Sequence, residues 1–203
     1  GFLGISILGV VQVNVEADEL KYFKARDPMR VASEHIQQQL GGVTSLDIVI
    51  EGTEMDVMKN PKLLQAIEGL QRYCESHDLI SYTLALPDYV KRINYVLHGN
   101  DPEYERLPNE IETVQFQEYE LVNGTETLVT KTEDIQGFDQ VAQFLLLYEM
   151  GGGDALENFV DDEYSQTRVV ARLRDNSTRQ LEQVLGQIQP YIQEHFSEFD
   201  VTV

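Results

Sequence analysis

Two residues that could act together in nucleophilic catalysis stand three positions apart in the segment QRYCESH. On a helix, Cys74 and His77 would share a face, and the imidazole could take the thiol proton and leave a reactive thiolate. Cys74 also extends an apolar stripe that contains Leu63, Ile67 and Leu70 at helical spacing. Because a buried cysteine usually acts as a small hydrophobic side chain, we interpret Cys74 as a core residue and His77 as a residue at the helix end.

The densest group of carboxylates lies in the segment DDEY, which runs from Asp161 to Tyr164 and has Asp154 and Glu157 upstream. Carboxylate oxygens are suitable ligands for Ca²⁺, but the spacing of these residues is not that of an EF-hand loop. A solvated surface explains the group better, with the arginines at 168, 172 and 174 as neighbours that offset part of its charge. We therefore predict no metal site here.

Other catalytic signatures are missing from the sequence. It contains no G-x-S-x-G, no H-E-x-x-H, no C-x-x-C and no phosphate-binding glycine loop, and Gly151–Gly153 do not match the last of these. His35, His98 and His195 fall in three separate predicted helices at spacings that do not suggest a shared metal. We predict no catalytic, cofactor-binding or metal-binding residue, and we do not expect an enzyme.

The elements that position these residues follow from the hydrophobic pattern. Alternation predicts strands at 11–17, 45–51, 80–86, 167–173 and 199–203, and apolar stripes predict helices at 27–40, 60–75, 87–98, 141–150 and 178–192. This order predicts a single α+β domain over residues 1–203. We expect a mixed β-sheet with helices packed on one face, built from split βαβ units of the ferredoxin-like type.

A β-hairpin is predicted as an insertion at residues 113–133. Two β-rich runs there are separated by Asn123 and Gly124, a dipeptide that suits a two-residue type I′ turn. The run QFLLLYEMGGG follows the hairpin and is too short to span a bilayer. We predict a buried helix in which Phe144 and Leu147 widen the apolar face, with Gly151 as its left-handed end.

The composition limits the partners. With 15 Lys and Arg against 35 Asp and Glu, the net charge is −20, a field that repels nucleic-acid phosphates, so we expect no nucleic-acid partner. Cys74 is the only cysteine and cannot form an internal disulfide. The apolar segment FLGISILGVV is about half as long as a membrane span, and we expect residues 1–10 to be the end of a longer membrane helix.

Several segments, taken in order across nearly the whole chain, resemble the RND (resistance, nodulation and division) superfamily of exporters, in its MMPL-like branch of lipid exporters. These segments are DELKYFKARDPMR, LGGVTSLDIVIEG, NPKLLQAIEGLQRYCE, LPDYVKRINYVLHGNDPEYERLP, VAQFLLLYEMGGGDALENFVDDEY and TRVVARLRD. The stretch between ERLP and VAQFLLLYE is longer than the family pattern, because the predicted hairpin occupies it. The hairpin could offer a contact surface to another subunit or partner.

The resemblance implies an extracytoplasmic (periplasmic) porter domain between the first and second helices of an inner-membrane protein. Such exporters use the proton gradient to move lipids or other hydrophobic molecules. Their proton-relay carboxylates lie in membrane helices that this sequence does not contain, so no such residue is carried over. The implied partners are a hydrophobic or lipid substrate, the remainder of the exporter chain with its membrane helices, and other copies in a homo-oligomer.

Two other functions remain open from the sequence. A free-standing α+β module that binds a small molecule or regulates a partner would use the same strands and helices. A hydrolase would have to use Cys74 or the acidic cluster at residues 161–163.

Overall fold

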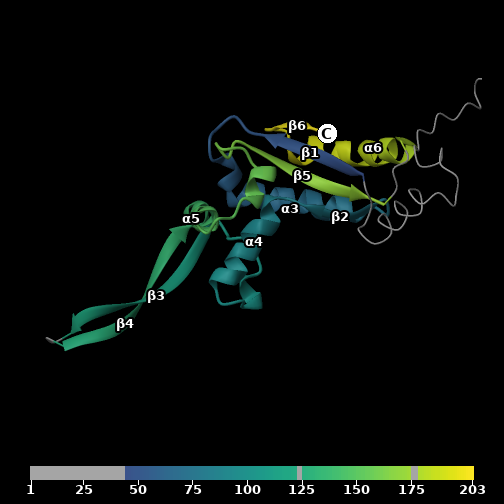
Figure 1. The fold of residues 1–203 in the computed structure, drawn as a ribbon. Helices are drawn as coiled ribbons and strands as arrows, with labels where there is room; N and C mark the ends of the chain where they lie inside the picture. Colours follow the sequence, from purple (N-terminus) through teal and green to yellow (C-terminus); the bar gives the residue numbers. More distant parts are fainter. Residues whose placement is uncertain (1–43, 123–124, 175–177) are drawn as a thin grey trace, which may run out of the picture.

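A computed structural model describes residues 44–122, 125–174 and 178–203 of the chain (Figure 1). The strand expected at 11–17, the helix expected at 27–40, the membrane-helix end expected at 1–10 and His35 lie outside the described residues. The described elements are a four-stranded sheet, a separate two-stranded sheet and the helices around them. These elements confirm the predicted α+β fold class.

The four-stranded sheet has the strand order β2-β5-β1-β6. Its strands are β1 (Ser45–Glu51), β2 (Ile80–Leu84), β5 (Gln166–Leu173) and β6 (Asp200–Thr202). Helix α3 (Pro61–Glu75) connects β1 to β2, and helix α6 (Thr178–His195) connects β5 to β6. In each unit the two strands run in the same direction with one strand of the other unit between them, so the chain forms two interlocked split βαβ units, as predicted.

Every described strand pair is antiparallel, whereas a mixed sheet was expected. The reason is the interlocking itself. Each βαβ crossover leaves a gap one strand wide, and the strand that fills the gap comes from the other unit and runs in the opposite direction. Strands that follow one another in the sequence are therefore not neighbours in the sheet.

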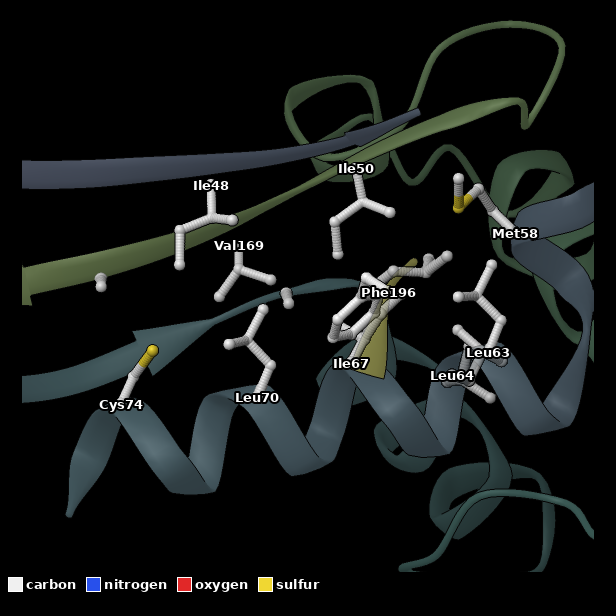
Figure 2. Close-up of a cluster of buried hydrophobic side chains, with 14 of the residues drawn as sticks. Ile48, Ile50, Met58, Leu63, Leu64, Ile67, Leu70, Cys74, Val169 and Phe196 are labelled. Carbon is white, nitrogen blue, oxygen red and sulfur yellow. The ribbon is translucent and has the colours of Figure 1, made fainter. Parts of the chain in front are cut away.

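One face of the sheet packs against α3 and α6 and forms the core. Every second residue of β1 and β5 is buried on this face, including Ile48 and Val169, and Figure 2 shows these side chains pointing toward the apolar stripe of α3. That stripe, which ends at Cys74, is buried as predicted. Helix α3 begins as expected, with the Asn60 side chain accepting a hydrogen bond from the Lys62 N–H next to Pro61.

A long insertion separates β2 from β5. It contains α4 (Leu86–Leu97), β3 (Ile111–Val122), β4 (Thr125–Gln136) and α5 (Gly137–Met150), with short 3-10 helices η3 (Pro102–Tyr104) and η4 (Ala155–Asn158); a further one, η2 (Val57–Lys59), precedes α3. Helices α4 and α5 contact each other and α3. Val90 of α4 and Val141 of α5 belong to the same core as the sheet.

Strands β3 and β4 form a hairpin that extends away from the other elements (Figure 1). It is longer than the predicted 113–133, because the ladder runs from the pair Ile111 and Gln136 to the pair Val122 and Thr125. The additional residue pairs at the base of the hairpin are rich in polar residues, so the alternation of apolar side chains does not reveal them. The two-residue connection falls at 123–124, where the turn was predicted, although those two residues lie outside the described part.

Two expectations for the helices of the insertion are wrong. Leu147 does not widen the buried face of α5, because its side chain is 51% exposed; Leu97 at the end of α4 is likewise 48% exposed. Gly151 has φ −75°, and the left-handed residue after α5 is Gly152 with φ 84°. Helix α5 and the end of helix α4 lie at the margin of the core, so part of the apolar surface of each helix faces outward.

Candidate binding groove

A groove of about 270 Å³ with a mainly apolar lining lies between α6 and the last residues of the sequence. Leu185, Ile188 and Ile192 line it from α6, and Val201 and Val203 line it from β6 and the residue after it. Two amide side chains, Gln189 and Gln193, supply its polar atoms. No charged side chain lines it, so the groove suits an apolar ligand segment or an apolar protein element.

The groove arises from a difference in length between two neighbouring elements. Helix α6 has 18 residues and carries its apolar stripe over about five turns, whereas β6 has three residues and, among the described strands, pairs with β1 alone. Ile188 and Ile192 of α6 are buried, Leu185 is half-buried, and Val203 is 44% exposed. β6 also forms the edge of the described sheet, so the groove lies beside an open strand edge.

Sequence reasoning identified the α6 residues of this groove but not their role. Leu185, Ile188 and Ile192 form an apolar stripe that is typical of a core, and an apolar stripe has the same spacing whether it fills a core or lines a groove. Whether Val201 and Val203 line the groove depends on where β6 ends in the sheet, which the spacing of apolar residues does not show. The contrast between a long amphipathic helix and a very short last strand is the signal that could have indicated the groove.

A second hollow, of about 390 Å³, is acidic and contains Tyr164 and Asp161. Asp161 accepts hydrogen bonds from the backbone N–H groups of Ser165 and Gln166 at 2.8 Å each, and from the Ser165 hydroxyl at 2.7 Å. Partial burial opposes ionisation, but these donors hold the pKa of Asp161 below its usual range. Its carboxylate therefore shapes the turn before β5.

Tyr164 has a similar structural role on the other side of this hollow. Its hydroxyl donates a short hydrogen bond to Glu149, and burial together with this carboxylate raises the pKa of Tyr164. The Lys59 ammonium lies 4.3 Å from the centre of the Tyr164 ring. Across the described part of the chain, no three acidic, His or Cys side chains are grouped so that they could hold a metal ion.

Cys74 lies in the core, whereas the His77 ring contacts the helix backbone. Cys74 is fully buried against the sheet, and burial, helped by the nearby charge of Glu75, raises the pKa of its thiol to about 12. The Nδ1 atom of His77 lies 2.9 Å from the Tyr73 carbonyl oxygen, as expected for a hydrogen bond donated by the ring. The raised pKa disfavours the thiolate, which is the form that acts as a nucleophile.

The other described histidines are also bound locally. His98 Nδ1 lies 2.8 Å from the Asn94 carbonyl oxygen within α4, and His195 Nδ1 lies 3.0 Å from the Tyr191 carbonyl oxygen within α6. Each ring also stacks on a tyrosine ring, at centroid distances of 3.7 and 4.0 Å respectively. The two histidines stay apart in different helices, as the sequence indicated.

The arginines of β5 project from the face of the sheet that α3 and α6 leave uncovered. Arg168 was expected to offset the acidic segment, but it forms its ion pair with Asp47 of β1 at 3.3 Å. It still lines a shallow hollow of about 350 Å³ together with Glu157 and Asp161. The cationic side chains therefore belong to the sheet surface more than to the acidic turn.

Comparison with known proteins gives no relative: neither protein-family models, nor curated proteins, nor solved structures match this chain significantly. Among residues 44–122, 125–174 and 178–203, no helix combines the length and apolarity that a membrane span requires. Functional inference consequently depends on the geometry and on the residues themselves.

Proposed function

We propose that this chain is an extracytoplasmic domain of a proton-driven RND-type exporter in the inner membrane, and that the α6–β6 groove contacts lipids or other hydrophobic molecules during export. The groove carries the proposal, because the described residues that line it are five with apolar side chains and two with amide side chains. Its volume is slightly below the usual range for small-molecule pockets, so it would take part of a lipid, such as a length of acyl chain.

The fold supports the proposal in a second way. Porter domains of the resembled family are expected to contain split βαβ units, and residues 44–203 contain two such units that share one sheet. The groove lies at the edge of that sheet, where the remainder of an exporter chain could add contacts to complete a pathway. In this arrangement the domain guides substrate, and proton transfer takes place in the membrane helices.

The alternative is a free-standing α+β module that binds a small apolar molecule in the same groove. The two functions differ in what surrounds the domain in its gene. An exporter requires about 20 consecutive apolar residues on each side of this sequence, whereas a free-standing module does not. Reading the complete gene therefore decides between them, and a reading frame without such flanking segments would eliminate the exporter.

The role of the groove is tested on the full-length protein by measuring copurified lipid. Leu185→Asn and Val203→Asp place polar groups in the groove at side chains that are only partly buried, so the fold should persist. We expect both variants to copurify less lipid. Leu97→Asn, an exposed apolar residue of α4 outside the groove, is the matched control. Equal lipid content in all three variants would contradict the proposed role.

A further inference from the structure

The β3–β4 hairpin, called the arm below, lacks the packing that stabilises strands elsewhere in the chain. Within the described residues, its two strands of 12 residues pair only with each other, and its main contact with other elements is between β4 and α5 at the base. An isolated two-stranded hairpin is at best marginally stable in water. A long arm of this kind is better explained if another surface covers it.

Three exposed apolar side chains lie together at the far end of the arm. Tyr119 and Leu128 are directly opposite each other in the ladder, and Leu121 follows two residues later on the same face. Their side chains are 72%, 48% and 76% exposed. Glu126 stands opposite Leu121, and these four residues are called the arm tip. The arm tip is therefore an apolar patch with a negative charge beside it.

The arm tip is out of reach of the sheet of its own molecule. Strands of 12 residues span about 40 Å at roughly 3.3 Å per residue, and Figure 1 shows the arm directed away from the sheet. At its base Gly137 N–H donates to the Glu110 carbonyl oxygen at 2.8 Å, which fixes the arm to the start of α5. The described sheet of the same molecule therefore does not cover the arm tip.

The sheet carries a surface with matching properties. On the face opposite α3 and α6, Leu84 is paired with Val170, and Tyr82 is paired with Arg172. Tyr82 is 43% exposed, and Arg172 forms no ion pair with other residues in the described part of the chain. These four residues are called the outer sheet face. It combines apolar side chains with a positive charge, which complements the arm tip.

Electrostatic repulsion disfavours a contact between two arms, so charge favours a contact between the arm tip and the outer sheet face. The described arm residues carry six carboxylates, at positions 112, 118, 120, 126, 133 and 134, against a single cation, Lys131. Two arms in contact would repel each other, and most of a chain with net charge −20 would repel them as well. Of the two arginines of β5, Arg168 is paired with Asp47, and Arg172 supplies the positive charge of the outer sheet face.

We infer that the arm tip of one copy of this chain docks on the outer sheet face of a second copy. Glu126 meets Arg172, and the apolar residues of the arm tip cover Tyr82, Leu84 and Val170. The contact joins two different surfaces, so it is heterologous and closes into a ring or extends into a filament, depending on the rotation between copies. This inference does not depend on the exporter function.

The test uses two variants of the 203-residue chain, each with one defective surface. The arm-defective variant is Tyr119→Ser with Leu128→Ser, and the sheet-defective variant is Arg172→Glu. Sedimentation equilibrium over a range of concentrations measures self-association. We expect the wild-type chain to associate, more weakly as salt increases, and each variant to show a dissociation constant at least about tenfold higher.

Mixing the two variants distinguishes this contact from others. One intact arm and one intact sheet face remain in the mixture, so a 1:1 mixture should form heterodimers although neither variant associates alone. Met150→Ser, which changes an exposed apolar residue outside both surfaces, should associate like the wild type. Circular dichroism verifies that every variant is folded, as expected for substitutions at positions that are exposed or, for Arg172, only partly buried.

Several results would overturn the inference. One is a wild-type chain that stays monomeric at about 1 mM, where a contact of millimolar affinity would still be roughly half populated. Another is association that Arg172→Glu leaves unchanged, which would indicate contact between arms or with another surface. A mixture that forms no heterodimers would exclude a contact between the arm tip and the outer sheet face.

Discussion

Strand β5 and the arm have similar alternating sequences, but their apolar side chains differ in solvent exposure. In β5 every second residue, such as Val169 and Leu173, is at most 3% exposed, because α3 and α6 form a second layer over that face. In the arm Tyr119 and Leu121 are more than 70% exposed, because none of the described elements forms a second layer over them. Alternation therefore predicts a strand, and burial depends on what packs against it.

The two regions also differ in what holds them together. The four-stranded sheet and the helices packed on it, called the body below, are stabilised by apolar area removed from water. The arm is stabilised by the hydrogen bonds between its two strands and by charged contacts. At mid-arm Lys131 forms ion pairs with Glu118 and Glu120, and these carboxylates raise its pKa. At the base Glu112 is bound by Arg106. Substitutions in the body should consequently affect global unfolding, and substitutions in the arm should affect local opening.

The largest expected effect is a matched pair of leucine truncations. Leu70→Ala removes a fully buried side chain from the core and should lower the free energy of unfolding by about 3 to 4 kcal/mol. Leu121→Ala removes the same atoms from the arm, where the side chain is 76% exposed, and should change it by less than about 0.5 kcal/mol. Urea denaturation at low protein concentration measures both. Similar losses in the two variants would contradict the distinction between body and arm.

The junction of arm and body should be the next most sensitive place. A Cβ atom at Gly137 would lie 1.7 Å from the Asn109 carbonyl oxygen, so Gly137→Ala must displace the backbone where β4 enters α5. We expect a loss of about 2 to 3 kcal/mol in denaturant unfolding. Gly186→Ala in α6 is the control, because no atom lies within 4 Å of its Cβ position, and it should stabilise the helix by about 0.5 to 1 kcal/mol.

This junction also marks the limit of what the sequence predicts. Alternation and helical stripes correctly placed β1, α3, β2, β5 and α6, because each has a clear apolar face that a neighbouring layer buries. The dipeptide at 123–124 placed the turn of the arm. The base of the arm was missed, since its two outermost pairs, Ile111 with Gln136 and Glu112 with Ile135, each join an apolar to a polar residue. Nothing local in the sequence requires Gly137 to lie against Asn109.

The candidate groove and the wrongly placed side chains have a common explanation. Whether Leu147 or Val203 is buried depends on where the last neighbouring element ends, and element boundaries are the least certain part of a sequence-based prediction. Leu147 was expected in the core and is exposed, while Val203 was expected in a strand and lines the groove. The burial of Cys74 was easier to predict, because this residue continues an apolar stripe whose spacing places it in the core.

A smaller effect is expected from Glu112, which anchors the base of the arm. Its carboxylate accepts two hydrogen bonds from Arg106, at 2.6 and 2.9 Å, and one from the Asn109 N–H at 2.6 Å. The Arg106 side chain is 42% exposed, so Glu112→Gln should cost only about 1 kcal/mol, seen as faster hydrogen exchange in β3. Glu126→Gln, at the far end of the arm, is the control.

The pH dependence of this anchor has a definite sign. The hydrogen bonds from Arg106, opposed by partial burial and supported by Asn109, hold the pKa of Glu112 below its usual range. The stabilisation that the ionised Glu112 carboxylate gives to the arm is complete above the ordinary Glu pKa of about 4.3. It is lost as the pH falls through the lower pKa that Glu112 has in the folded protein. Hydrogen exchange in wild-type β3 should therefore accelerate in that acid window more than in Glu112→Gln. Identical pH profiles would show that Glu112 does not anchor the arm.

The smallest effect should come from Lys131→Gln at mid-arm. Lys131 lies between Glu118 and Glu120 on one face of the ladder, and its removal leaves the two carboxylates without their cation. Because the site is exposed, the amides of the adjoining rungs should exchange only slightly faster at low salt, and the difference should vanish at high salt. Lys62→Gln removes an exposed ion pair with Glu110 outside the arm and should leave arm exchange unchanged. A large effect of Lys131→Gln that persists at high salt would mean that packing, as in the body, also stabilises the arm.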